Sequence, residues 1–223
     1  MERDDLFTLI HKALRRGLFL VTMRAGATDW TDPEQVAGLQ AEWRPLLALL
    51  RVHTEHEDEH ILRVLDPYEH AATDVIADQH RDLDDLLEHL AESFDKAPGD
   101  PAAGLDLYRD LARFVAAYLP HLHEEETGVM PRIWAHCTDA EIAAARAAFM
   151  AATPPGVQAT TLELVLPAVD PATRAALVTG MARTAPPPVV DGVLAIADRV
   201  LDAPSATALR DLVAVPPAVH ATE

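Results

Sequence analysis

The sequence is short of cysteine, of basic residues and of long apolar runs, and each shortage excludes a class of protein. Its 223 residues contain one cysteine, Cys137, which rules out an intrachain disulfide framework and suits a reducing compartment. Lys and Arg total 18 against 36 Asp and Glu, and the net charge of −18 argues against nucleic acid or anionic membrane surfaces as partners. The charged start, Met-Glu-Arg-Asp-Asp, is unlike a signal peptide, and no segment approaches an apolar membrane span. We therefore expect a soluble, cytoplasmic protein.

Glycine is also scarce, with 9 residues, and apolar residues recur at helical rather than alternating spacing, which predicts an all-α fold. Long helices are expected at about residues 4–24, 31–65, 71–94 and 102–128, with a chain break at Asp66-Pro67. Pro120 lies inside the last of them and should loosen its backbone. Short turns and one apolar stripe per helix predict an antiparallel, up-down four-helix bundle over residues 1–135.

The composition changes after this bundle. Ten of the 17 prolines follow residue 138, and short amphipathic segments lie between them. This pattern predicts a small helical appendage over residues 138–223, with prolines at its corners. Its role is unassigned, and a protein partner or self-association through it is one option.

Histidines and carboxylates interrupt the apolar stripes of the expected bundle. Three of the stripes contain the pattern His-x-x-x-carboxylate: His53/Glu57, His80/Asp84 and His121/Glu125. Residues four apart lie one turn apart on one helix face, so each pair could hold the same ion or two adjacent ions. The first helix supplies His11 alone, because its neighbour one turn later is Arg15.

Energetics favour a metal at these positions. A buried ionised carboxylate costs several kcal/mol unless it is neutralised, paired or metal-bound, and only Arg15 lies near these positions. Mixed imidazole and carboxylate ligands suit iron, manganese or zinc, and several carboxylates favour a dinuclear site. Such a set would leave an open position for a small ligand such as dioxygen, peroxide or nitric oxide.

The order of these residues resembles that of the hemerythrin-like (HHE cation-binding) domains. Their pattern is a lone His, a His-x-x-x-Glu, a His and a second His-x-x-x-Glu on successive helices. The chain matches it over about residues 1–135, with His11, His53/Glu57, His80 and His121/Glu125. The resemblance implies a non-haem di-iron centre bridged by Glu57 and Glu125, which binds oxygen-derived small molecules or senses iron and oxygen.

One residue departs from the oxygen-carrying members of that family, which have a histidine where this chain has Asp84. An aspartate there adds negative charge, should favour the oxidised metal and makes simple oxygen transport doubtful. The expected metal ligands are thus His11, His53, Glu57, His80, Asp84, His121 and Glu125. We expect His60 and Tyr118 beside the metal, and Glu55, Asp58, Glu59, Glu124 and Glu126 on a solvated acidic face.

Other functions use the same residues. One alternative is an enzyme that dismutates peroxide or acts as an oxidase at the same metals, and another is an iron-responsive switch read out by the C-terminal region. His56-Glu57-x-x-His60 also matches the zinc metallopeptidase motif. That interpretation is less favoured because it leaves His11, His53, His80 and His121 unexplained.

Overall fold

The computed structural model describes residues 3–214, which form helices joined by short connections, so the all-α expectation is confirmed. The helices of the first part are α1 (Thr8–Ala27), α2 (Pro33–His56), α3 (Leu62–Lys96), α4 (Pro101–Glu124), α5 (Met130–His136) and α6 (Asp139–Ala152). Two π-helical turns, η1 (Glu57–Ile61) and η2 (Glu125–Val129), follow α2 and α4 directly. The remaining helices are α7 (Pro155–Val165), α8 (Pro171–Thr184), α9 (Pro187–Val200) and α10 (Ala203–Ala214).

Two of the long helices begin with the same signal, an aspartate cap before a proline. The Asp32 carboxylate accepts hydrogen bonds from the backbone N–H groups of Glu34 and Gln35, and Pro33 occupies the first turn. Asp100 caps α4 in the same way ahead of Pro101. An aspartate at this place satisfies N–H groups that have no partner within the helix, and proline tolerates the first turn because it has no N–H.

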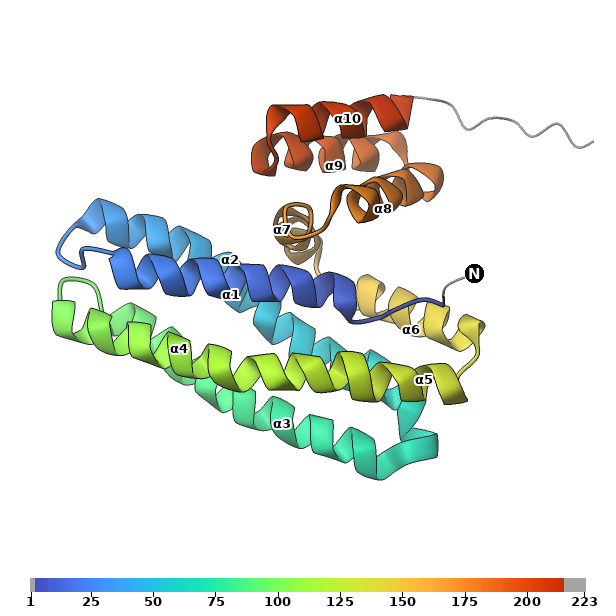
Figure 1. The fold of residues 1–223 in the computed structure, drawn as a ribbon, viewed down its shortest axis with the longest axis horizontal. Coiled ribbons are helices and arrows are strands. Elements are labelled where there is room, and N and C mark those ends of the chain that lie inside the picture. The colour runs from blue at the N-terminus through green and yellow to red at the C-terminus, as the bar shows by residue number, and fades with distance from the viewer. Residues whose placement is uncertain (1–2, 215–223) are drawn as a thin grey trace, which may run out of the picture. The chain divides into compact units, whose positions relative to one another are not determined.

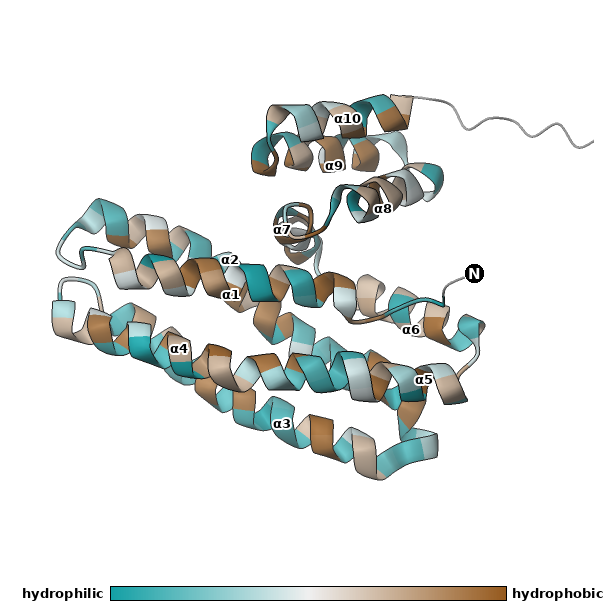
Figure 2. Ribbon diagram, in the orientation of Figure 1, coloured by the Kyte–Doolittle hydropathy of each residue, from teal (hydrophilic) through white to brown (hydrophobic). Residues whose placement is uncertain are grey.

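The four long helices pack side by side, with α1 and α3 each lying against both α2 and α4 (Figure 1). Hydrophobic and hydrophilic residues alternate along them, as in amphipathic helices (Figure 2). Leucines dominate the buried faces, and the ring of Trp43 on α2 stacks on that of Phe94 on α3 at 4.3 Å between centroids. This packed core fixes the four helices that carry the candidate site.

The chain breaks between the second and third long helices close to the expected place. The range of α3, Leu62–Lys96, joins two helices across a kink at Glu69, whose φ and ψ are −139° and 54°. Pro67 offers no N–H to the turn before it, and the backbone leaves the helical conformation two residues later. By contrast, α4 continues through Pro120 as far as Glu124, so its departure from α geometry comes at η2 rather than at the proline.

The structure divides into two compact units, residues up to Gln158 and residues from Ala159 onward. The first compact unit thus extends past the expected boundary at 135–138, because α6 packs on the end of the bundle. Ile142 and Phe149 of α6 join a buried apolar cluster with Phe7, and Arg146 pairs with Asp4 at 2.6 Å.

The second unit has an apolar cluster of its own, which explains why α8, α9 and α10 fold together. Its buried members are Leu166, Val178, Val193, Ile196, Ala197 and Leu209. Across residues 3–214, no helix combines the length and the apolar character that a membrane crossing requires.

Gly104, in the first turns of α4, makes room for a neighbouring indole. A Cβ at this position would overlap the ring of Trp30, which is itself 6% exposed. We predict that Gly104→Ala lowers the free energy of unfolding by about 1–2 kcal/mol, because overpacking outweighs the higher helix propensity of alanine. Urea unfolding followed by tryptophan fluorescence measures the loss.

The matched control is Gly180→Ala in α8, where a Cβ meets nothing within 4 Å. The same chemical change should there stabilise the second unit by up to about 1 kcal/mol, as followed by circular dichroism. Equal effects of the two substitutions would show that the Trp30 contact has no energetic consequence.

Candidate metal centre

Histidines from all four long helices and glutamates from the two π-helical turns meet in the interior of the bundle. They form two groups of potential ligands, His11, His53, Glu57 and Glu125 in one and His80, His121 and Glu125 in the other. Within each group the candidate atoms lie within 4.8 Å of one another, and every member is buried. Glu125 belongs to both groups, so the two form one continuous cluster.

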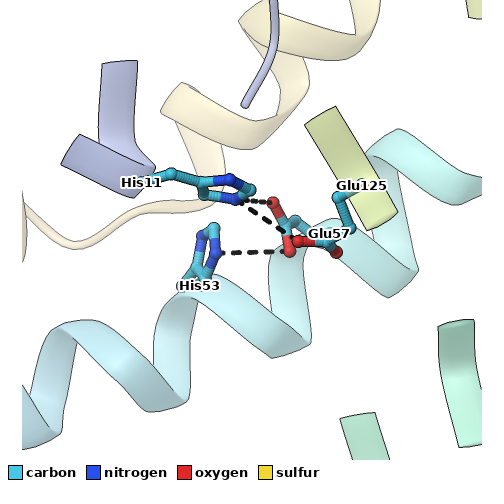
Figure 3. A group of neighbouring side chains, drawn as sticks. All are labelled: His11, His53, Glu57 and Glu125. Atoms are coloured by element: carbon cyan, nitrogen blue, oxygen red, sulfur yellow. Dashed lines mark ion pairs between the residues drawn. The ribbon is translucent and has the colours of Figure 1, made fainter. Parts of the chain in front are cut away.

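The first group is drawn in Figure 3, where the rings of His11 and His53 point toward the two carboxylates. His11 Nε2 lies 3.3 Å from Glu125 Oε2 and 3.8 Å from Glu57 Oε1. His53 Nε2 lies 3.4 Å from Glu57 Oε2. The Nε2 atoms of both histidines thus face carboxylate oxygens across a small interior space.

The second group repeats this arrangement around Glu125. His80 Nε2 and His121 Nε2 lie 3.2 and 3.4 Å from Glu125 Oε1. His80 Nε2 also lies 3.7 Å from Glu57 Oε2, so each glutamate faces histidines of both groups. Such an arrangement suits carboxylates that bridge two cations.

Several atoms of the cluster are buried without a hydrogen-bond partner among the residues described. They are His11 Nε2, both ring nitrogens of His53, both oxygens of Glu57 and Glu125 Oε2. Buried polar atoms without partners are costly, and native proteins usually satisfy them. Because these atoms converge on one another, a cation between them would satisfy all of them except His53 Nδ1.

Without a metal, protons supply the positive charge that the cluster needs. Burial alone would lower the pKa of His11, but the hydrogen bond to Glu126 and the nearby carboxylates of Glu57 and Glu125 raise it to about 9. The pKa of His80 rises to about 10 in the same way, against burial and through Asp58 and Glu125. Burial and the charge of Glu125 raise the pKa of Glu57 to about 8.

A second layer of side chains orients the histidine rings. Nδ1–H of His11 donates to Glu126 Oε1 at 3.0 Å, and Nδ1–H of His80 donates to Asp58 Oδ1 at 2.7 Å. His121 Nδ1–H donates to Gln79 Oε1 at 3.0 Å. A histidine whose Nδ1–H is held in this way presents Nε2, with its free electron pair, to a metal.

The expectation that Asp58 and Glu126 belong to a solvated acidic face is therefore wrong. Each directly follows a glutamate of the cluster and is the second residue of a π-helical turn. In this position the carboxylate reaches the ring of a histidine. The signal in the sequence is an acidic residue directly after each His-x-x-x-Glu, which a helical wheel with uniform α geometry places outside.

Asp84, expected as a ligand, lies outside both groups. Its side chain is exposed, whereas His80 one turn earlier is buried. Asp58, from the other half of the bundle, makes the contact to His80 instead.

The two residues expected beside the metal differ in their positions. The Tyr118 ring lies 5.8 Å from the His121 ring between centroids, and its buried hydroxyl has no hydrogen-bond partner within residues 3–214. His60 is partly exposed and belongs to neither group, and its Nε2 lies 3.9 Å from Glu59 Oε2.

The residues of the metallopeptidase motif are separated by packing. His56 is buried against α6, where its ring meets Phe149 edge-on and its Nδ1 lies 3.2 Å from Thr153 Oγ1. Glu57 faces the opposite way, into the cluster with His11 and Glu125. His56 and His60 therefore form no ligand group with Glu57 in the part of the chain that the structure describes.

A helical bundle whose core holds imidazoles and carboxylates from four helices defines a class of metal-binding bundle proteins. The chain belongs to the hemerythrin family, since the family model for the hemerythrin HHE cation-binding domain matches residues 3–133. The resemblance noted in the sequence is thus confirmed, and membership indicates a metal-binding protein. No curated protein and no solved structure gives a significant match.

The unpartnered hydroxyl of Tyr118 leads to a prediction about the metal-free protein. We expect Tyr118→Phe to leave the free energy of unfolding unchanged or to raise it by up to about 1 kcal/mol, because a buried hydroxyl without a partner contributes nothing favourable. The measurement is urea unfolding in the presence of a chelator. Tyr108→Phe, at a hydroxyl-bearing side chain that is 38% exposed, is the control. A loss above about 1 kcal/mol, specific to position 118, would contradict the prediction.

Proposed function

We propose that this protein binds two metal ions in the interior of its bundle, as a non-haem di-iron centre. The proposal rests on one observation, two buried groups of histidines and carboxylates that share Glu125 and contain polar atoms without partners. Two separate mononuclear sites would not require a shared carboxylate. Iron suits this mixture of imidazole and carboxylate, and manganese and zinc have overlapping preferences.

The proposed ligands divide between the two positions. His11, His53 and Glu57 would hold one ion, His80 and His121 the other, and Glu125 would contact both. Glu57 also faces His80, which supports a bridging role for it as well. Asp58, Glu126 and Gln79 would hold the histidine rings in place.

We propose that the ligand of this centre is a small molecule: dioxygen, peroxide or nitric oxide. Two adjacent irons, when bound, would supply electrons for the chemistry of such molecules. The protein side of the site supports a small ligand, because the ligand side chains are at most 5% exposed. Tyr118, whose ring lies 5.8 Å from that of His121, has a buried hydroxyl without a partner within residues 3–214, which would be available to donate a hydrogen bond to such a ligand. The protein would bind, sense or convert this ligand in the cytoplasm, a compartment that a single unpaired cysteine suits.

The first test is metal content. The full chain, produced with iron, manganese and zinc all available, should contain close to two irons by mass spectrometry. Glu125→Gln should retain one ion or fewer, because both groups lose a ligand. Glu124→Gln changes the exposed neighbour and should retain two. Wild-type protein without stoichiometric metal would refute the proposal.

Reactivity is tested separately on the metal-loaded protein. Reduced, iron-loaded protein mixed with dioxygen, peroxide or nitric oxide should change its near-ultraviolet and visible absorption. Zinc-loaded protein, which has no accessible redox change, should not. Identical traces for the two metals would rule out redox chemistry at the site.

Metal affinity should rise with pH. In the metal-free protein the pKa values of His11, His80 and Glu57 are raised to about 9, 10 and 8, so at neutral pH these groups hold protons that a metal must displace. Each displaced proton strengthens binding by up to roughly tenfold per pH unit. Competition titrations with a zinc chelator at pH 6, 7 and 8 measure the slope. An affinity that is constant over this range would mean that these groups are not the ligands.

A further inference from the structure

The two halves of the bundle repeat one arrangement around the proposed metal centre. His11 on α1 corresponds to His80 on α3, and the run His53–Asp58 corresponds to His121–Glu126. The acidic residue at the end of each run holds the histidine of the other half. Asp58 accepts from His80 Nδ1–H, and Glu126 accepts from His11 Nδ1–H.

The repeat fails at one pair of positions. One turn after His11 comes Arg15, whereas one turn after His80 comes Asp84. Arg15 donates two hydrogen bonds to Glu126, from Nη1 at 2.6 Å and from Nη2 at 3.1 Å. This bidentate pair neutralises the carboxylate that orients His11.

Asp84 has the opposite effect in the other half. It interacts electrostatically with both His80 and Asp58, and its negative charge adds to that of Asp58. No ion pair joins Asp58 or Asp84 to a Lys or Arg within residues 3–214, and Arg51, which interacts electrostatically with Asp84, is held in a bidentate pair with Glu88. The orienting groups of His11 therefore sum to about zero charge, and those around His80 sum to about two negative charges.

We propose that Arg15 and Asp84 make the two metal positions electronically unequal, so that the iron beside His80 and His121 is the harder of the two to reduce. The inference rests on the proposed di-iron function. Negative charge near a metal favours its higher oxidation state, and a carboxylate on the far nitrogen of a histidine makes that ligand a stronger donor. Arg15 cancels this effect at His11, and Asp84 reinforces it at His80. Asp84 thus acts through charge, from outside the ligand set.

The test is a spectroelectrochemical reduction of the iron-loaded full chain, which resolves two one-electron steps. Asp84→Asn should make the second, harder step easier by roughly three- to twentyfold in its equilibrium constant, the effect of one nearby charge. Arg15→Gln should make the first step harder by a similar factor. Both substitutions therefore bring the two steps together, although Asp84→Asn makes the net charge more positive and Arg15→Gln makes it more negative.

Matched variants separate this local effect from a change in overall charge. Asp82→Asn removes a charge from the exposed surface of the same helix as Asp84, and Arg16→Gln removes the charge next to Arg15. Both should leave the separation of the steps within about twofold of wild type. Arg15→Lys keeps the positive charge, so its first reduction step should match that of the wild type. This variant distinguishes the loss of a charge in Arg15→Gln from a loss of folding.

The outcomes distinguish this inference from the function on which it rests. Fewer than two irons in the wild-type chain would refute the proposed function and the inference together. Two irons, with steps that shift equally in the variants and in their controls, would overturn the inference and leave the proposed function intact.

Discussion

Two carboxylates buried side by side are the constraint on which the rest of this structure depends. Glu57 and Glu125 have no exposed surface, and an apolar interior cannot hold two adjacent negative charges without compensation. Histidines from all four long helices surround them, and the hydrogen-bond partners of those histidines extend to the protein surface. Away from this cluster the bundle has an ordinary core of leucine and aromatic side chains, so the polar cluster is confined to one level of the bundle.

The π-helical turns explain how one short motif supplies both a glutamate and the acidic residue that follows it. Each turn begins at the glutamate of a His-x-x-x-Glu motif and spans five residues. Such a turn contains an extra residue relative to an α-helix and occurs frequently at functional sites. The extra residue brings two consecutive acidic side chains close enough to the interior to contact histidines of different helices. The motif therefore builds two layers of the site from adjacent residues.

Much of this arrangement could be predicted from the sequence. The regular spacing of apolar residues indicates the long helices, and the histidines and glutamates that interrupt it indicate the six side chains that converge. Asp58 and Glu126 could not be found in this way, because a wheel with uniform α geometry does not contain the π-helical turns. Asp84 was assigned to the interior from its spacing alone, but tertiary packing leaves it at the surface. The position of α6 depends on contacts with Phe7 and Ile61, which no local pattern contains.

The exchange of acidic residues between the two halves has a consequence for how the protein folds. Asp58 completes the surroundings of His80, and Glu126 completes those of His11, so a helical hairpin formed from either half alone contains only part of a site. Ligand geometry and long-range packing must then appear in the same cooperative step. A newly synthesised chain would acquire its capacity to retain a cation only after its fourth long helix has docked, which protects partly folded chains from capturing metal in a half-built centre.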